Sequence, residues 1–241
     1  MNVESYYTWS LCYDKEQKEL DVLKKLGALS LSSEILEVGC GTGRLTARLA
    51  NGVNKIVAID PDGDAIAFCK MKYSFTNVLF YQSSLEDLVC QKKFDYVIYS
   101  WSMYLIKDKE NSLFLAKSLL KKGGKIIVLQ ANSGEYESNI AKLYSKYDSL
   151  ARYGDACNAL EPIMEKIFGN VSCETLLTHF SFSDIEDLVA RSLFFIEDEE
   201  GFVPSSSQIN SFKNDMAKYK KPDDSFHLTD IVSVFYSEKK D

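Results

Sequence analysis

Residues Glu37–Gly43 read E-V-G-C-G-T-G and carry the strongest chemical signal in the chain. They follow the apolar pair Ile35 and Leu36 and precede an apolar-periodic stretch, Arg44–Ala50, so the pattern predicts a strand, a glycine turn and a helix. Glycines at alternate positions allow a sharp turn and leave room for a ligand against the backbone. The amides at the start of the helix would face that ligand.

A carboxylate suited to binding a ribose follows the next expected strand. The apolar stretch Lys55–Ile59 ends at Asp60, 21 residues after Gly39. A carboxylate at this place accepts hydrogen bonds from both hydroxyls of a ribose. Asp60 and the glycine turn therefore form a two-part nucleotide signature.

The glycine spacing argues against a dinucleotide. A dinucleotide site needs G-x-G-x-x-G, because the third glycine lets the helix pack closely under a pyrophosphate. Counted from Gly39 that position is Arg44, and counted from Gly41 it is Thr46. A G-x-G-x-G turn of this kind resembles motif I of the S-adenosylmethionine-dependent methyltransferases with the Rossmann-like fold.

The resemblance covers nearly the whole chain and implies roles for the residues of the signature. Glu37 would anchor the methionine ammonium of the cofactor, directly or through water. Gly39 and Gly41 would allow close backbone approach, and Asp60 would bind the ribose. The implied cofactor is S-adenosyl-L-methionine, with S-adenosyl-L-homocysteine as its product.

Further cofactor contacts are implied at the ends of later strands. Pro61 follows Asp60, where the family packs a side chain on the adenine, and Ser84 and Leu85 lie in a stretch that holds the adenine edge. Ser83 stands where the family usually has Asp, which puts a carboxylate contact to the adenine amine in doubt. Turn chemistry alone could also explain Pro61, Ser84 and Leu85.

The methionine moiety and the acceptor are expected at the other end of the site. Ser100 ends a strand at the place where the family holds the methionine moiety. Residues 6–14 resemble the Y-x-x-W-x-x-x-Y-D opening of small-molecule methyltransferases, a segment that folds over the cofactor. Tyr13 is thereby implied near the cofactor carboxylate, and Tyr6, Trp101 and Tyr136 are expected in the acceptor pocket. Alternatively, these aromatic residues only pack against one another within the segment that covers the cofactor and bind no ligand.

Methyl transfer requires little chemistry from the protein, which must hold a nucleophile in line with the methyl group and exclude water. A base is needed only if the acceptor is protonated when it attacks. His179 and Tyr104 are the candidates for that role. We expect no metal site, since no carboxylate cluster suits metal-dependent methylation.

Composition fits an acidic α/β protein. The chain has 241 residues and a net charge of −7. Proteins that bind a nucleic-acid phosphate backbone usually carry excess positive charge, which this chain does not have. The cysteines are far apart, and no apolar stretch of ~20 residues could span a bilayer. We therefore expect a cytoplasmic monomer or homodimer that binds neither membrane nor nucleic acid.

The periodic segments alternate between strand and helix, which predicts a single α/β domain with a seven-stranded, mostly parallel sheet and helices on both faces. The resemblance implies that the last strand is antiparallel. The expected strands are Glu34–Val38, Lys55–Ile59, Val78–Tyr81, Phe94–Tyr99, Lys125–Leu129, Leu193–Glu197 and Ile231–Tyr236. The expected helices include Asp14–Leu26, Pro61–Tyr73, Lys109–Leu120 and one from a Ser183–Glu186 capping box to Ser192.

One long insertion departs from the simplest members of the family. Residues 131–182 follow the fifth expected strand and contain two helical stretches and a short strand-like piece, Glu174–Phe180. Because elements at the carboxyl edge of an open sheet lie beside the ligand crevice, we interpret the insertion as an α-rich lid, which residues 1–30 join as a cover. The alternative is a surface embellishment without function.

Two classes of function remain. The favoured one is transfer of a methyl group to nitrogen or oxygen of a small molecule, achieved mainly by proximity and orientation. The alternatives are methylation of a protein or tRNA, and a non-catalytic partner subunit that binds the cofactor.

Overall fold

The computed structural model describes residues 3–132, 160–196 and 205–240, and its core is a seven-stranded sheet in the order β3-β2-β1-β4-β5-β7-β6. The strands are β1 (Glu34–Val38), β2 (Lys55–Asp60), β3 (Val78–Gln82), β4 (Phe94–Ser100), β5 (Leu120–Ala131), β6 (Ser172–Phe182) and β7 (Phe226–Glu238). Strands β1 to β5 are parallel, and β7 is antiparallel to both β5 and β6. The expected mostly parallel sheet with an antiparallel last strand is confirmed.

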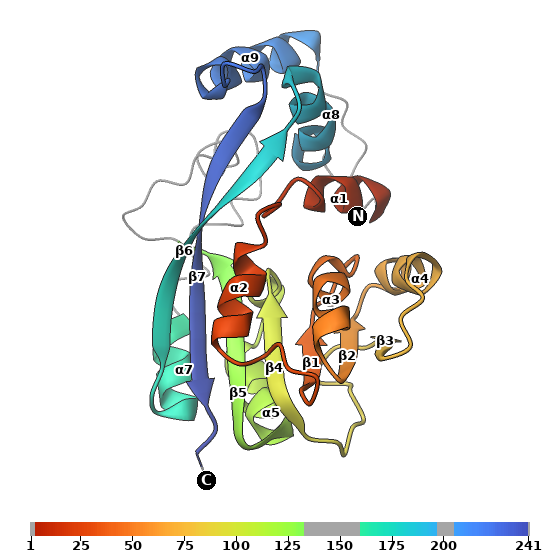
Figure 1. The fold of residues 1–241 in the computed structure, drawn as a ribbon, viewed down its shortest axis with the longest axis vertical. Coiled ribbons are helices and arrows are strands. Elements are labelled where there is room, and N and C mark those ends of the chain that lie inside the picture. Colours follow the sequence, from red (N-terminus) through yellow and green to blue (C-terminus); the bar gives the residue numbers. More distant parts are fainter. Residues whose placement is uncertain (1–2, 133–159, 197–204, 241) are drawn as a thin grey trace.

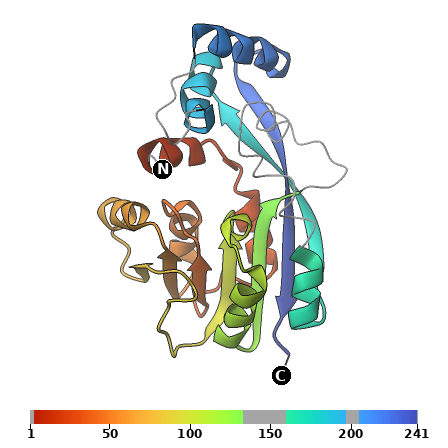
Figure 2. The same ribbon diagram turned by 180° about the vertical axis from the view of Figure 1, so that it is seen from behind.

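Helices cover both faces of the sheet and its upper end (Figures 1 and 2). They are α1 (Val3–Ser10), α2 (Lys18–Lys25), α3 (Arg44–Leu49), α4 (Gly63–Lys72), α5 (Lys109–Leu119), α7 (Leu160–Phe168), α8 (Ile185–Ile196) and α9 (Ser206–Met216). Helices α2, α3 and α4 lie on one face, whereas α5 and α7 lie on the other (Figures 1 and 2). Helices α1, α8 and α9 lie above the carboxyl ends of the parallel strands (Figure 1).

The central strands alternate between two hydrophobic cores. In β5, Ile127 belongs to the core under α2, α3 and α4, whereas Ile126 and Val128 belong to the core under α5 and α7. Successive strand residues point to opposite faces, so a strand covered on both sides needs an unbroken apolar run. This explains the continuous apolar runs Val97–Tyr99 in β4 and Ile126–Leu129 in β5.

Strands β6 and β7 continue beyond the end of β5 and support the upper helices. The pairing of β5 with β7 ends at Ala131 opposite Val232, whereas β6 pairs with β7 as far as Phe182 opposite Phe226. The two-stranded extension carries α8 and α9 above the sheet (Figure 1). The resulting overhang places α1 over the carboxyl edge of the sheet.

One predicted strand is wrong. Residues 193–196 of the expected strand Leu193–Glu197 belong to helix α8, and the sixth strand is β6 instead. A short apolar run suits a buried helix as well as a strand, so its periodicity could not decide between them. The strand-like piece Glu174–Phe180 was the correct signal.

The predicted cap of α8 is displaced by one residue. The carboxylate of Asp184, rather than the hydroxyl of Ser183, accepts the hydrogen bond from the amide of Asp187, at 2.8 Å. A capping box does occur at Ser205 and Gln208, where it begins α9.

The described part of the insertion belongs to the main architecture. Helix α7 packs beside α5 on one face, and β6 forms the edge of the sheet (Figure 2). Residues 133–159 lie outside the described residues, so a lid in this segment stays a prediction. Among the described residues, α1, α8 and the ends of β6 and β7 form the part of the molecule that lies over the carboxyl edge of the sheet (Figure 1).

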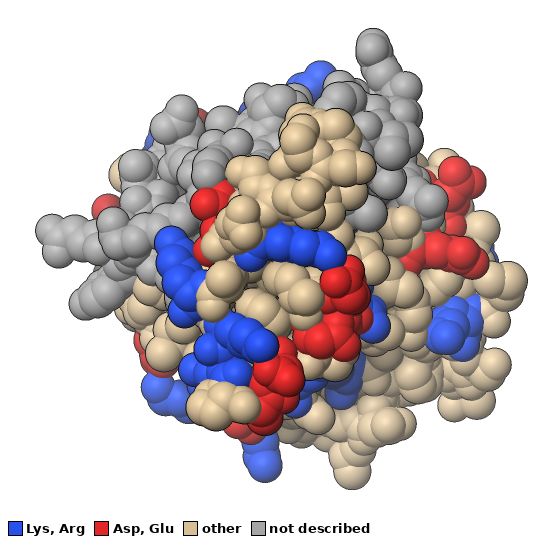
Figure 3. Space-filling model, turned by 90° about the horizontal axis from the view of Figure 1, so that it is seen from above, with Lys and Arg blue, Asp and Glu red and all other residues tan. Residues whose placement is uncertain are grey.

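Charges of both signs are mixed over the upper end of the molecule (Figure 3). Two ion pairs there join Lys213 to Glu186 at 2.7 Å and Lys220 to Asp224 at 2.6 Å. Within the described ranges, no helix is long and apolar enough to cross a membrane. The same ranges contain no group of three or more His, Cys, Asp or Glu residues arranged to bind a metal ion.

Candidate functional site

The glycine turn joins β1 to α3 and is held by the end of β2. The amides of Gly39 and Cys40 donate to the carbonyl of Ile59 at 2.8 and 3.0 Å. The amide of Gly41 donates to Oδ2 of Asp60 at 2.8 Å. These bonds hold the turn against the end of the neighbouring strand β2.

Two of the glycines are required by both conformation and space. Gly39 and Gly41 have φ of +75° and +51°, where side chains are disfavoured. A Cβ at Gly39 would lie 2.3 Å from Cβ of Ser102, whereas one at Gly41 would lie 3.3 Å from Cε1 of Tyr6. The first glycine therefore faces the turn after β4, and the second faces the N-terminal helix.

Asp60 organises the loop and still faces solvent. Its second carboxylate oxygen accepts the amide of Asp62 at 2.9 Å, and the side chain is half-buried. Each oxygen retains a lone pair for a ligand hydroxyl. Burial raises the pKa of the carboxyl, while the two backbone hydrogen bonds oppose that shift.

Glu37 is buried at the base of the turn, with 1% of its surface exposed. Its Oε2 accepts a hydrogen bond of 2.6 Å from Thr46 on α3. Burial raises the pKa of Glu37 from 4.5 to about 7. The carboxyl is therefore poised to ionise when a cation enters the pocket beside it.

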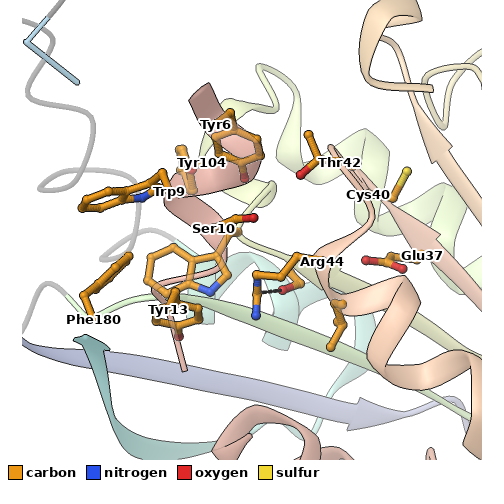
Figure 4. Close-up of a pocket in the computed structure, with 14 residues that line it drawn as sticks. Tyr6, Trp9, Ser10, Tyr13, Glu37, Cys40, Thr42, Arg44, Tyr104 and Phe180 are labelled. Atoms are coloured by element: carbon orange, nitrogen blue, oxygen red, sulfur yellow. Dashed lines mark hydrogen bonds between the residues drawn. The ribbon is translucent and has the colours of Figure 1, made fainter. Parts of the chain in front are cut away.

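A pocket at the carboxyl edge of the sheet joins these residues to the N-terminal helix (Figure 4). Its walls come from four places: α1 and the segment after it, the glycine turn with α3, the end of β4, and β6. The lining residues are Tyr6, Trp9, Ser10, Tyr13, Glu37, Gly39, Cys40, Thr42, Arg44, Leu45, Ser100, Trp101, Tyr104 and Phe180.

The lining is strongly aromatic. Trp9 stacks on Phe180 with ring centroids 4.7 Å apart, and Tyr13 meets Trp101 edge-to-face at 5.2 Å. Trp101 also has a φ of +57°, an uncommon conformation for a bulky residue, directly after β4. Strained backbone of this kind is found at functional sites, where the surrounding structure maintains it.

Arg44 brings a positive charge to the wall of the pocket. Its guanidinium donates to Glu19 at 2.7 Å and to the hydroxyl of Ser100 at 3.2 Å, and it lies 4.8 Å from the ring centroid of Tyr13. Attraction to Glu19 raises the pKa of Arg44 against the opposing effect of burial, so the group stays charged.

The structure gathers most of the residues expected at the methionine and acceptor end. Those in the pocket are Tyr6, Tyr13, Glu37, Gly39, Ser100, Trp101 and Tyr104. Tyr136 lies outside the described residues.

The residues expected at the adenosine end lie at the ends of β2 and β3, outside the pocket lining. Asp60 and exposed Pro61 are adjacent, and the side chain of Leu85 is buried in the core under α5. The hydroxyl of Ser84 donates to Asp87 at 2.7 Å and accepts its amide at 3.1 Å. The hydroxyl of Ser84 is therefore used in hydrogen bonds within its own turn. A role for Ser84 in binding the cofactor stays a prediction.

The structure does not bring His179 into the pocket. Its ring lies 6.4 Å from that of His227, and Nδ1 is 4.0 Å from Glu16. The next residue, Phe180, lines the pocket, and adjacent residues of a strand point to opposite faces. His179 thus has no geometric support as the base, and Tyr104 is the candidate of the two that lies in the pocket.

Sequence reasoning missed Arg44, Phe180 and Glu19. Arg44 was considered only as a missing glycine, although a cation one residue beyond the turn was a usable signal. Glu19 and Phe180 carry no local signal, because only the packing of α2 and β6 brings them to the glycine turn.

Comparisons with known proteins show the family of the chain. The profile of a family described as "Methyltransferase domain" matches residues 30–185. The ubiquinone/menaquinone biosynthesis C-methyltransferase UbiE of Wigglesworthia glossinidia brevipalpis is 28% identical over 135 residues, which are 53% of this chain and 54% of that protein. A malonyl-[acyl-carrier protein] O-methyltransferase of Bacillus anthracis is 34% identical over 91 residues, 37% of this chain and 34% of the relative. The matches thus span about half or less of these relatives.

Among solved structures, the YcgJ protein of Bacillus subtilis superposes with a TM-score of 0.63 at 12% identity. The superposition covers 92% of this chain and 98% of YcgJ. At that identity the likeness concerns the fold.

Proposed function

The chain belongs to the class I S-adenosylmethionine-dependent methyltransferases, and from this premise we propose that it methylates nitrogen or oxygen of a small molecule held in the aromatic pocket. The observation that carries the proposal is the pocket itself, which joins the glycine turn, the end of β4 and the N-terminal helix.

The cofactor would lie across the ends of β1 and β2. Asp60 would accept hydrogen bonds from the ribose, and Gly39 and Gly41 would let the cofactor lie close against the turn. The ammonium of its methionine moiety would meet Glu37, whose ionisation it would favour. S-adenosylmethionine supplies an electrophilic methyl group, so the protein has to orient the acceptor and exclude water.

The aromatic wall would hold the acceptor. Tyr and Trp provide large apolar contact areas with polar tips, which suits a small molecule carrying one reactive group. The relatives' names include an enzyme of quinone biosynthesis and one that acts on malonyl-[acyl-carrier protein]. The mixed charges of Figure 3 and the overall acidity give tRNA less support than a small acceptor.

Calorimetry with S-adenosylhomocysteine and NADH tests the cofactor. We expect binding of the first and none of the second, because the turn lacks the third dinucleotide glycine. Gly41→Val should abolish binding by intruding on the ligand and on Tyr6.

Gly123→Val is the matched control for that variant. Gly123 also has a positive φ, +73°, but an added Cβ would meet nothing within 4 Å. It therefore reproduces the backbone strain without the intrusion. Tight binding of NADH, or normal affinity in Gly41→Val, would contradict the proposed site.

A further inference from the structure

Behind the pocket, Glu19 of α2 accepts hydrogen bonds from three lining residues. Tyr13 Oη and Trp101 Nε1 each donate to Oε1 at 2.8 Å, and Arg44 donates to Oε2 at 2.7 Å. Glu19 itself is fully buried and does not line the pocket. The three donors come from separate segments: the stretch after α1, the turn after β4, and α3.

We propose that Glu19 is a positioning residue that sets the methionine end of the pocket by holding Tyr13, Trp101 and Arg44 in one arrangement. The proposal rests on the proposed function, because it assigns Glu19 to the cofactor site. It does not require Glu19 to touch the cofactor.

The physical reason is the number of donors that share one buried carboxylate. A buried charge is stable only when it is paired and hydrogen-bonded, so Glu19 and Arg44 require each other. The planar guanidinium of Arg44 is further oriented by Ser100 and by the ring of Tyr13. Because the group is planar and rigid, these contacts also fix the orientation of its other N–H groups. A glutamine at this position would have one acceptor oxygen and one NH2 group, so at least one of the three donors would face another donor.

A second ion pair between the same elements provides the internal control. Asp14, just before α2, accepts from Arg48 on α3 at 3.0 Å, and its carboxylate also accepts the amides of Lys18 and Glu19. Like Glu19 it is buried, with 1% exposure. Neither Asp14 nor Arg48 lines the pocket, so this pair supports the structure without facing the ligand.

The chain has two tryptophans, Trp9 and Trp101, and both line the pocket. In a Trp9→Phe background, fluorescence excited at wavelengths beyond the absorption of the 14 tyrosines therefore reports Trp101 alone. The experiment compares Glu19→Gln with Asp14→Asn in this background. It measures the emission of the ligand-free protein, the affinity for S-adenosylhomocysteine by calorimetry, and the unfolding midpoint in urea.

We expect Glu19→Gln to shift the Trp101 emission and weaken cofactor binding about tenfold or more, the effect of losing a charge-assisted hydrogen bond. Asp14→Asn should lower the unfolding midpoint while leaving the emission unchanged and the affinity within about threefold. Glu19→Asp keeps the charge but withdraws it by one methylene, so it should fold and still weaken binding.

Equal losses of affinity in Glu19→Gln and Asp14→Asn would overturn the proposal, since both pairs would then act through stability alone. Unchanged emission in both Glu19→Gln and Glu19→Asp would also overturn it, and if Glu19→Gln does not fold, Glu19→Asp alone decides. If the parent protein binds no S-adenosylhomocysteine, the proposed function fails. The emission of the ligand-free variants then still decides whether Glu19 holds Trp101.

Discussion

The glycine turn and the N-terminal cover, residues 3–13, form opposite walls of one pocket but are held by different interactions. The turn is fixed by hydrogen bonds to the adjacent strand β2, including those to Ile59 and Asp60. The cover is fixed by segments far along the chain. The amide of Asp14 donates to His179 and that of Ser181 to Cys12, each at 2.9 Å, and Arg191 of α8 donates to the carbonyl of Thr8 at 2.6 Å.

The glycine turn is therefore a rigid part of the sheet, whereas the cover is a separate segment docked onto it. The turn cannot change without disturbing the parallel sheet, because its neighbours β1 and β2 are buried on both faces. The cover consists of one short helix, α1, and the turn that follows it. Its undocking would expose aromatic residues without breaking the sheet, so we expect it to open at lower cost.

The largest expected effect is at Gly39. Gly39→Ala places a Cβ 2.3 Å from Cβ of Ser102 in a backbone with φ of +75°. Displacing Ser102 also disturbs its hydrogen bond to the carbonyl of Val38, at 2.6 Å. We expect a loss of about 3 kcal/mol or more in the free energy of unfolding, measured by urea denaturation. A variant as stable as the parent would show that the turn is less rigid than its contacts indicate.

Asp60→Ala tests the ligand-facing side of the same wall. Loss of the bonds to two ribose hydroxyls should weaken cofactor binding by ~2–3 kcal/mol. The carboxylate also accepts the amide of Gly41, so a smaller loss of stability should accompany it. Calorimetry and thermal unfolding on the same samples separate the two effects. Unchanged affinity with a lowered melting temperature would make Asp60 purely structural.

Glu37 should make cofactor binding depend on pH. Its pKa is raised from 4.5 to about 7, so the carboxyl is protonated in the free protein under mildly acidic conditions. Binding an ammonium requires the ionised form, so affinity should rise about tenfold between roughly pH 6 and pH 8. Calorimetry of Glu37→Gln should give a weaker affinity without this rise.

The same shift predicts the sign of the stability change. A folded-state pKa above the unfolded value contributes stability that is complete below pH 4.5 and is lost as the pH rises through about 7. The parent should therefore lose stability relative to Glu37→Gln over this range. A constant difference between the two proteins would contradict a raised pKa of Glu37.

The smallest effect on global stability is expected in the cover. Trp9 packs on Phe180 and Phe182, with ring centroids 4.7 and 5.7 Å away. Trp9→Ala should undock α1 at a cost of about 1 kcal/mol in global stability, because the sheet remains folded. Hydrogen exchange should show lost protection confined to the cover.

Leu49→Ala is the matched control in the sheet layer. Leu49 is fully buried on α3, and its truncation should cost about 2–5 kcal/mol over the whole protein. If Trp9→Ala lowers global stability as much as Leu49→Ala, the cover is part of the cooperative core, and the contrast between the two walls fails.

The residues found from the sequence alone are those whose signals are local. The strand, glycine turn and helix around Gly39 and Gly41, and the carboxylate of Asp60 after the next strand, follow from spacing within one βαβ unit. The apolar runs in β4 and β5 likewise predict strands buried on both faces, because they alternate along the chain with segments of helical spacing. The family and the sheet architecture follow from these features.

Tertiary structure alone decided which side chains meet at the pocket. Phe180 lines it and His179 does not, although they are neighbours in sequence, because the register of β6 against β7 determines which face points inward. Glu19 reaches Arg44 and Trp101 only through the packing of α2 against α3 and the end of β4. The apolar run 193–196 suits a strand as well as a helix, and in the folded chain it forms the end of helix α8. A sequence expresses spacing along the chain, whereas these contacts depend on the register and packing of segments far apart in it.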